Sequence, residues 1–82
     1  MKWRRVKTKG WFARAEWRAK CNGWLLTVAS FTNFPATDIA GYHVMARQGE
    51  LVFNSAWEEV GGTIFRTPED AMDFAEQWVG AL

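Results

Sequence analysis

The chain has few of the residues on which most enzyme and metal sites depend. Its 82 residues include one cysteine, one histidine and one tyrosine. A single thiol cannot form an internal disulfide, so the cysteine count favours a reducing, cytoplasmic setting. Neither Cys21 nor His43 has a second ligand or a catalytic partner at a recognised spacing. The sequence therefore predicts no enzyme activity, no metal ion and no cofactor.

Long apolar runs are also missing. The longest, residues 24–31, is interrupted by Thr27 and Ser30 and is far shorter than the roughly 20 residues that cross a bilayer. No continuous apolar segment follows the basic N-terminus, as a secretory signal requires. We therefore expect a complete, soluble chain with no membrane partner. Its length predicts one domain over residues 1–82, because a chain this short encloses a single core.

Aromatic residues, by contrast, are abundant. Six Trp, six Phe and one Tyr make up 16% of the chain. Each ring buries about 150–250 Å² when it is fully covered. The core of a small domain has too little room for all of them, so we expect some rings at the surface.

Residues 67–82 give the clearest structural signal, that of one capped amphipathic helix. Thr67 suits the N-cap, and Pro68 at the first helical position loses no needed donor. At about 100° per residue, apolar and charged side chains fall on opposite halves of the helix. The apolar half holds Ala71, Met72, Phe74, Ala75, Trp78, Val79 and Leu82, and the polar half holds Glu69, Asp70, Asp73, Glu76 and Gln77.

The residues before this helix read as sheet. Asn22-Gly23 is the strongest short signal for a hairpin turn, and a Gln48-Gly49 turn would place Arg47 opposite Glu50 as an ion pair. We predict an α+β fold: an antiparallel meander of four or five strands with one C-terminal amphipathic helix packed on one face. The candidate segments for these strands are residues 2–8, 11–20, 24–31, 42–46, 51–53 with a continuation toward 57, and 63–65. Residues 55–58 could instead cap one helical turn.

Alternation is clearest in residues 11–20, which predict a strand with two different faces. One face is apolar and the other carries most of the charge. The apolar face holds Trp11, Ala13, Ala15, Trp17 and Ala19, and the charged face holds Phe12, Arg14, Glu16, Arg18 and Lys20.

Charge is strongly segregated along the chain, although the net charge is only +1. Residues 1–20 carry eight Lys and Arg against one Glu, a net charge of +7. Residues 21–82 carry two Arg against eight Asp and Glu, a net charge of −6. Either the two parts neutralise each other across the fold, or the basic strands attract an anionic polymer.

The first functional hypothesis is a small non-enzymatic module that binds nucleic acid through its basic N-terminal strands. Cations suit phosphates and flat rings suit bases, so basic residues interleaved with aromatic ones favour this function. Glu16, in the middle of the basic row, weakens the pattern. The predicted binding residues are Arg4, Arg5, Lys7, Lys9, Phe12, Arg14, Arg18 and Lys20.

The second hypothesis is a protein-binding adaptor or inhibitor of the kind that phages and other mobile elements encode. It would act through exposed aromatic residues and the acidic face of the helix, as a monomer or a homodimer. The character of the sheet face opposite the helix, basic or aromatic, distinguishes the two hypotheses. The candidate protein-binding residues are Glu69, Asp70, Asp73, Glu76 and Phe34.

Overall fold

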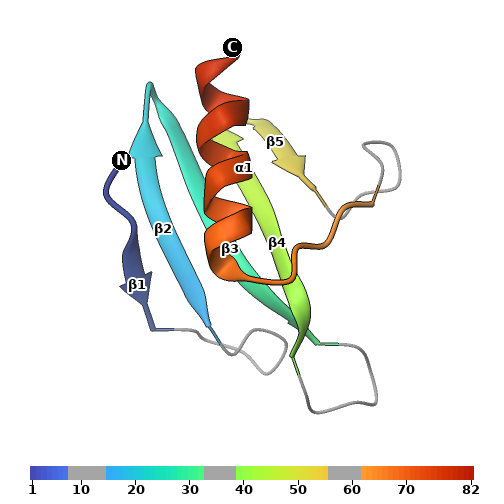
Figure 1. The fold of residues 1–82 in the computed structure, drawn as a ribbon. Helices are drawn as coiled ribbons and strands as arrows, with labels where there is room; N and C mark the ends of the chain where they lie inside the picture. Colours follow the sequence, from blue (N-terminus) through green and yellow to red (C-terminus); the bar gives the residue numbers. More distant parts are fainter. Residues whose placement is uncertain (8–14, 33–38, 56–61) are drawn as a thin grey trace.

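A computed structural model, which describes residues 1–7, 15–32, 39–55 and 62–82, shows a five-stranded antiparallel sheet with one helix on one face (Figure 1). The strands lie side by side in the order in which they occur in the sequence. This arrangement confirms the predicted α+β meander. The elements are β1 (Arg4–Val6), β2 (Glu16–Cys21), β3 (Trp24–Thr32), β4 (Ile39–Gln48), β5 (Leu51–Asn54) and α1 (Pro68–Gly80).

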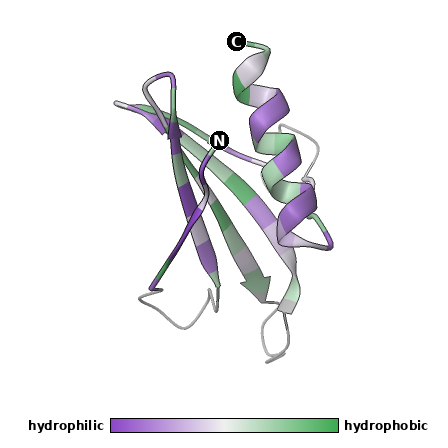
Figure 2. Cartoon of the chain, turned by 60° about the vertical axis from the view of Figure 1, so that its left-hand side comes forward, coloured by the Kyte–Doolittle hydropathy of each residue, from purple (hydrophilic) through white to green (hydrophobic). Residues whose placement is uncertain are grey.

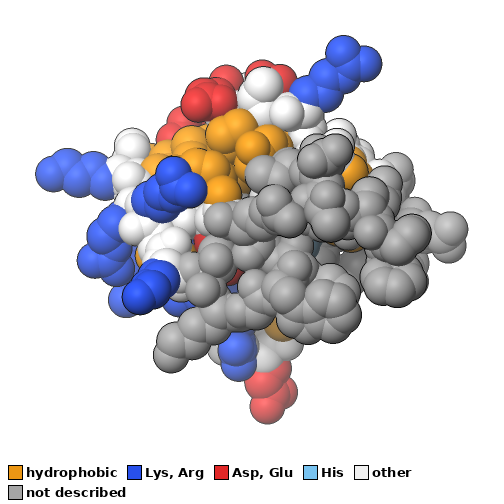
Figure 3. Space-filling view, turned by 90° about the horizontal axis from the view of Figure 1, so that it is seen from below, with side chains coloured by type: hydrophobic (Ala, Val, Ile, Leu, Met, Phe, Trp, Pro, Cys, Tyr) orange, Lys and Arg blue, Asp and Glu red, His pale blue; other side chains and the backbone are white. Residues whose placement is uncertain are grey.

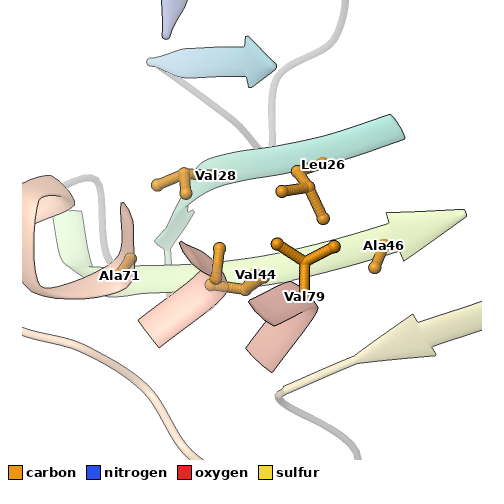
Figure 4. Packing of buried hydrophobic residues seen from close by; sticks show 7 residues of the cluster. Leu26, Val28, Val44, Ala46, Ala71 and Val79 are labelled. Carbon is orange, nitrogen blue, oxygen red and sulfur yellow. The ribbon is translucent and has the colours of Figure 1, made fainter. Parts of the chain in front are cut away.

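The core lies between α1 and the two central strands, β3 and β4. Side chains of both strands point toward the helix in Figure 4. Ala71 and Ala75 are completely buried, and their small side chains let the helix backbone lie close to the sheet. Larger rings from α1 and the neighbouring strands pack around this centre. The buried cluster consists of Leu26, Val28, Val44, Ala46, Ala71, Ala75 and Val79.

The helix begins as its sequence predicts. Thr67 has an extended backbone, and its side chain accepts a hydrogen bond from the Asp70 N–H at 3.1 Å, while Pro68 occupies the first turn. Leu82 does not join the apolar side, because α1 ends at Gly80 and the Leu82 side chain is 71% exposed. At 13 residues, α1 is too short to span a membrane, and no other helix occurs in the described ranges.

The β2–β3 hairpin confirms the turn predicted at Asn22-Gly23. Cys21 pairs with Trp24, and both central residues have positive φ angles, 51° for Asn22 and 81° for Gly23. Positive φ at both positions is the type I′ geometry, whose twist matches that of the strands it joins.

The β4–β5 hairpin is shifted by one residue from the predicted register. Gln48 pairs with Leu51, so the turn residues are Gly49 and Glu50, and Arg47 lies opposite Val52. Gly49 has a φ of 60°, and a glycine with positive φ at the first central position is characteristic of a type II′ turn. The predicted Arg47–Glu50 cross-strand pair was therefore wrong.

Two strand predictions also need correction. The first strand is shorter than residues 2–8, since only Arg4–Val6 pairs with β2. Residues 63–65 form a single bridge in place of a strand, with both backbone hydrogen bonds between Tyr42 and Phe65 at 2.8 Å. The Thr63 N–H instead donates a hydrogen bond to the Ser55 carbonyl at 2.7 Å. The expected continuation toward residue 57 lies outside the described residues.

Candidate functional site

The sheet has a second face that points away from α1. Leu26 and Val28 point toward the helix, so Leu25 and Thr27 point the other way, and paired residues on adjacent strands share their face. We call this surface the far face. Its described residues are Arg4, Val6, Glu16, Arg18, Lys20, Leu25, Thr27, Ala29, Phe31, His43, Met45, Arg47, Val52 and Asn54.

Cations gather at one end of the far face, next to the β2–β3 turn. Arg4 pairs with Arg18, while Leu25 pairs with both Lys20 and Arg47 on its two sides. Figure 2 shows hydrophilic segments along β1 and β2. Figure 3 shows most of the Lys and Arg at the left and most of the Asp and Glu at the top, with further acidic atoms at the bottom. The surface of the protein is therefore polarised between the basic sheet edge and the acidic helix.

The pairing of Arg4 with Arg18 places two positive side chains directly opposite each other. Like charges at such a cross-strand position destabilise a sheet. Among the described residues, neither Arg4 nor Lys20 has a carboxylate within ion-pair distance. The Glu16 carboxylate, 2.8 Å from Arg18, offsets part of this repulsion, whereas Arg4 has no such partner in the described ranges.

Arg18 differs from the other cations because Glu16 holds it. One carboxylate oxygen of Glu16 lies 2.9 Å from Arg18 Nε and 2.8 Å from Nη2. The Glu16 side chain is 15% exposed, whereas that of Arg18 is 50% exposed. Glu16 thus holds the Nε–Nη2 edge of the half-exposed Arg18 guanidinium.

Two open hollows adjoin these cations and share Lys20 and Leu25 in their walls. The larger, of about 800 Å³, lies where β1 separates from the edge of β2. The smaller, of about 580 Å³, lies beside the β2–β3 turn and includes Arg47. A ligand in them would contact several cations together with Leu25, and with Trp3 in the larger hollow or Trp24 in the smaller one. The larger hollow is lined by Lys2, Trp3, Arg4, Arg18, Ala19, Lys20 and Leu25.

The structure brings only part of the predicted basic set together. Arg4, Arg18 and Lys20 share the far face, but Arg5 lies on the helix side with its guanidinium 5.4 Å from the centre of the Trp17 ring. Lys7 is exposed just beyond β1. The remaining predicted residues, Lys9, Phe12 and Arg14, lie outside the described residues.

Sequence reasoning missed two cations, Lys2 and Arg47, that line these hollows. Lys2 belongs to the basic N-terminal run, and its charge was a usable signal. Arg47 is distant in sequence and reaches the site only because β3 and β4 pair Leu25 with it. Only the strand register could have identified it.

The acidic helix face is only partly available to a partner. Glu69, Asp70 and Asp73 are exposed. The carboxylate of Glu76 instead accepts a hydrogen bond from the indole N–H of Trp3 at 3.1 Å. This contact ties the N-terminus to α1 just before β1 and Arg4. Phe34, the fifth candidate, lies outside the described residues.

Removing the indole N–H of Trp3 tests the hydrogen bond between the N-terminus and α1. Trp3→Phe keeps an aromatic ring and loses the hydrogen bond to Glu76, so we expect a loss of about 0.5–1.5 kcal/mol in the free energy of unfolding. Urea denaturation would measure it. Asp73→Asn, at an exposed position of the same helix, is the control and should change stability by less than about 0.5 kcal/mol. Equal stabilities for the two variants would show that the contact adds nothing.

The fold and the far face together define a small α+β domain with a cationic sheet surface. Within the described ranges, no three or more His, Cys, Asp or Glu residues lie together where they could hold a metal ion. The chain matches no protein-family model, no curated protein and no solved structure. Any functional conclusion therefore depends on the physical character of its surface.

Proposed function

We propose that this chain is a non-enzymatic module that binds nucleic acid through the cations of the far face and Lys2 beside them. The binding set is Lys2, Arg4, Arg18, Lys20 and Arg47, all of which line the two hollows beside Leu25. The single cysteine favours a role in the cytoplasm.

The observation that carries this proposal is the direct pairing of Arg4 with Arg18. A sheet that needed only to fold would gain from an opposite charge or a neutral residue at one of these positions. An anionic polymer removes the repulsion, because each phosphate neutralises a cation and releases condensed counterions. The site thus becomes more stable when a polyanion is bound.

Salt dependence gives a quantitative test. Four or five phosphate contacts predict that log K falls against log salt with a slope of about −3.6 to −4.5 on duplex and about −2.8 to −3.5 on single strands. Fluorescence anisotropy with labelled duplex and single-stranded DNA and RNA, at several salt concentrations, would measure this slope. Absence of binding to all four at low salt would refute the proposed function.

Two double variants distinguish binding by the far-face cations from binding that depends only on the net charge of the protein. Lys20→Gln with Arg47→Gln should flatten the slope on duplex by about 1.8, since each lost contact removes about 0.9. Lys7→Gln with Arg66→Gln removes the same charge at exposed positions outside the far face, and should flatten it much less. Equal effects of the two pairs would mean that binding follows net charge and not this site.

A protein-binding adaptor or inhibitor is the second candidate. It is favoured by the edge strand β5, where Leu51 and Val52 are 63% and 50% exposed, and by the exposed carboxylates of Glu69, Asp70 and Asp73. An exposed apolar edge strand can pair with another chain, including a second copy. This candidate replaces the first if no nucleic acid binds.

A further inference from the structure

We propose that Arg18 reads guanine in the major groove of double-stranded DNA and that Glu16 positions it for this task. This inference rests on the proposed function and narrows it to one class of nucleic acid and one base. It arises from the Glu16–Arg18 contact, which phosphate binding alone does not require.

The contact gives Arg18 a different chemistry from the cations around it. A residue that only attracts phosphate needs a charge without a carboxylate beside it, and within the described ranges Arg4 and Lys20 meet this condition. A nearby carboxylate repels phosphate, so Glu16 works against binding of that kind. Guanine is neutral, and its O6 and N7 acceptors take two parallel N–H groups of an arginine fork. A carboxylate that fixes the fork is therefore an advantage for base reading and a disadvantage for phosphate binding.

The geometry leaves the required edge of Arg18 available. Glu16 occupies Nε and one hydrogen of Nη2. Within the described ranges, Nη1 and the second hydrogen of Nη2 have no protein partner. These groups form the end of the guanidinium, the part that can donate to both guanine acceptors. Because its inner edge is already held, Arg18 loses less side-chain freedom when it meets a base.

The surroundings favour a duplex over a single strand. Single strands are held by exposed rings on which bases stack, yet the far-face residues around these cations are Leu25, Thr27 and Met45. The two rings that line the hollows are engaged with α1, because Trp3 donates its indole N–H to Glu76 and Trp24 packs edge-on against Trp78. The far-face rings Phe31 and His43 lie further along the sheet and pack against each other, with their ring centres 6.3 Å apart. The major groove of B-DNA is about 12 Å wide and admits a two-stranded ribbon, which β1 and β2 provide at the sheet edge. The deep, narrow major groove of duplex RNA does not.

Arg4, Lys20 and Arg47 then take the complementary role of phosphate contacts. Arg4 lies directly opposite Arg18 on the edge strand, while Lys20 and Arg47 lie on either side of Leu25. Such contacts fix the register of a protein on DNA without reading sequence. The far face thus combines one arginine held by a carboxylate with three cations, Arg4, Lys20 and Arg47, that have no carboxylate partner in the part of the chain that the structure describes. Of these three, Arg47 donates its Nε–H to the Gly49 carbonyl at 3.2 Å.

The test is selection from a random-sequence duplex DNA pool, followed by binding measurements on the selected duplex. We expect one guanine to be enriched, and its replacement by 7-deazaguanine, which lacks N7, to weaken binding about tenfold. Arg18→Gln removes the guanidinium fork, so its selected pool should lose that guanine. Arg4→Gln should instead weaken binding to all duplexes by a similar factor, because a phosphate contact carries no sequence information. Thermal melting would confirm that both variants are folded.

Each failure has its own meaning. Salt-dependent binding with no enriched guanine, or a guanine preference that survives in Arg18→Gln, overturns this inference and leaves the proposed function standing. Tighter binding to single strands than to any duplex overturns it as well. No binding to any nucleic acid removes the proposed function and this inference together.

Discussion

Replacing Trp78 with alanine is expected to lower the free energy of unfolding by about 3–4 kcal/mol, within the range found when large aromatic side chains are removed from cores. Trp78 stacks on Phe53, with ring centres 4.9 Å apart, and meets Trp24 edge-on at 5.1 Å. These contacts join α1 to both β3 and β5, which are not neighbours in the sheet. A domain of this size is stable by about 4–10 kcal/mol, so much of its stability depends on this ring.

The neighbouring residue Gln77 provides the control. It lies in the same turn of α1 but is exposed, and Gln77→Ala should change stability by less than about 0.5 kcal/mol. Urea denaturation followed by circular dichroism would measure both variants. If Trp78→Ala unfolded at the same urea concentration as Gln77→Ala, the aromatic contacts between the helix and the sheet would contribute little.

Local signals in the sequence predicted the elements whose geometry is itself local. The Thr67-Pro68 start of α1 and the Asn22-Gly23 turn each depend on a few adjacent residues, and both were confirmed. The β4–β5 turn was misplaced because Gly49 can serve at either central position of a two-residue turn. Leu51 and Val52 are both apolar and both exposed, so no alternation of polarity showed which register was correct.

The candidate site could be predicted from the sequence to a smaller extent than the fold. The excess of positive charge in residues 1–20 was evident from composition. Composition does not show which cations share a surface, because that depends on pairing between strands. Register places Arg5 on the helix side over Trp17 and brings Arg47 beside Leu25. The hold of Glu16 on Arg18 also depends on side-chain geometry, and the sequence presented Glu16 only as an interruption of a basic row.

Two adjacent leucines test whether the two faces of the sheet differ in how tightly their side chains are packed. Leu26 is completely buried on the helix side, and in Figure 4 it points with Val79 into the space between β3 and α1. Leu25 lies on the far face beside the cations and is only partly buried. Since the two residues share their type and their strand, differences in backbone propensity cancel between the two alanine variants.

Leu26→Ala should destabilise the domain by about 2–5 kcal/mol, through the lost burial and the cavity that remains. Leu25→Ala should cost no more than about 1–2 kcal/mol, because its side chain loses less contact and water can fill the space. Urea denaturation of the two variants, with equal m-values as the check that the unfolding reaction is unchanged, would measure the difference. Equal losses would mean that the far face is packed as tightly as the core, and a surface packed in that way could not accept a ligand around Leu25.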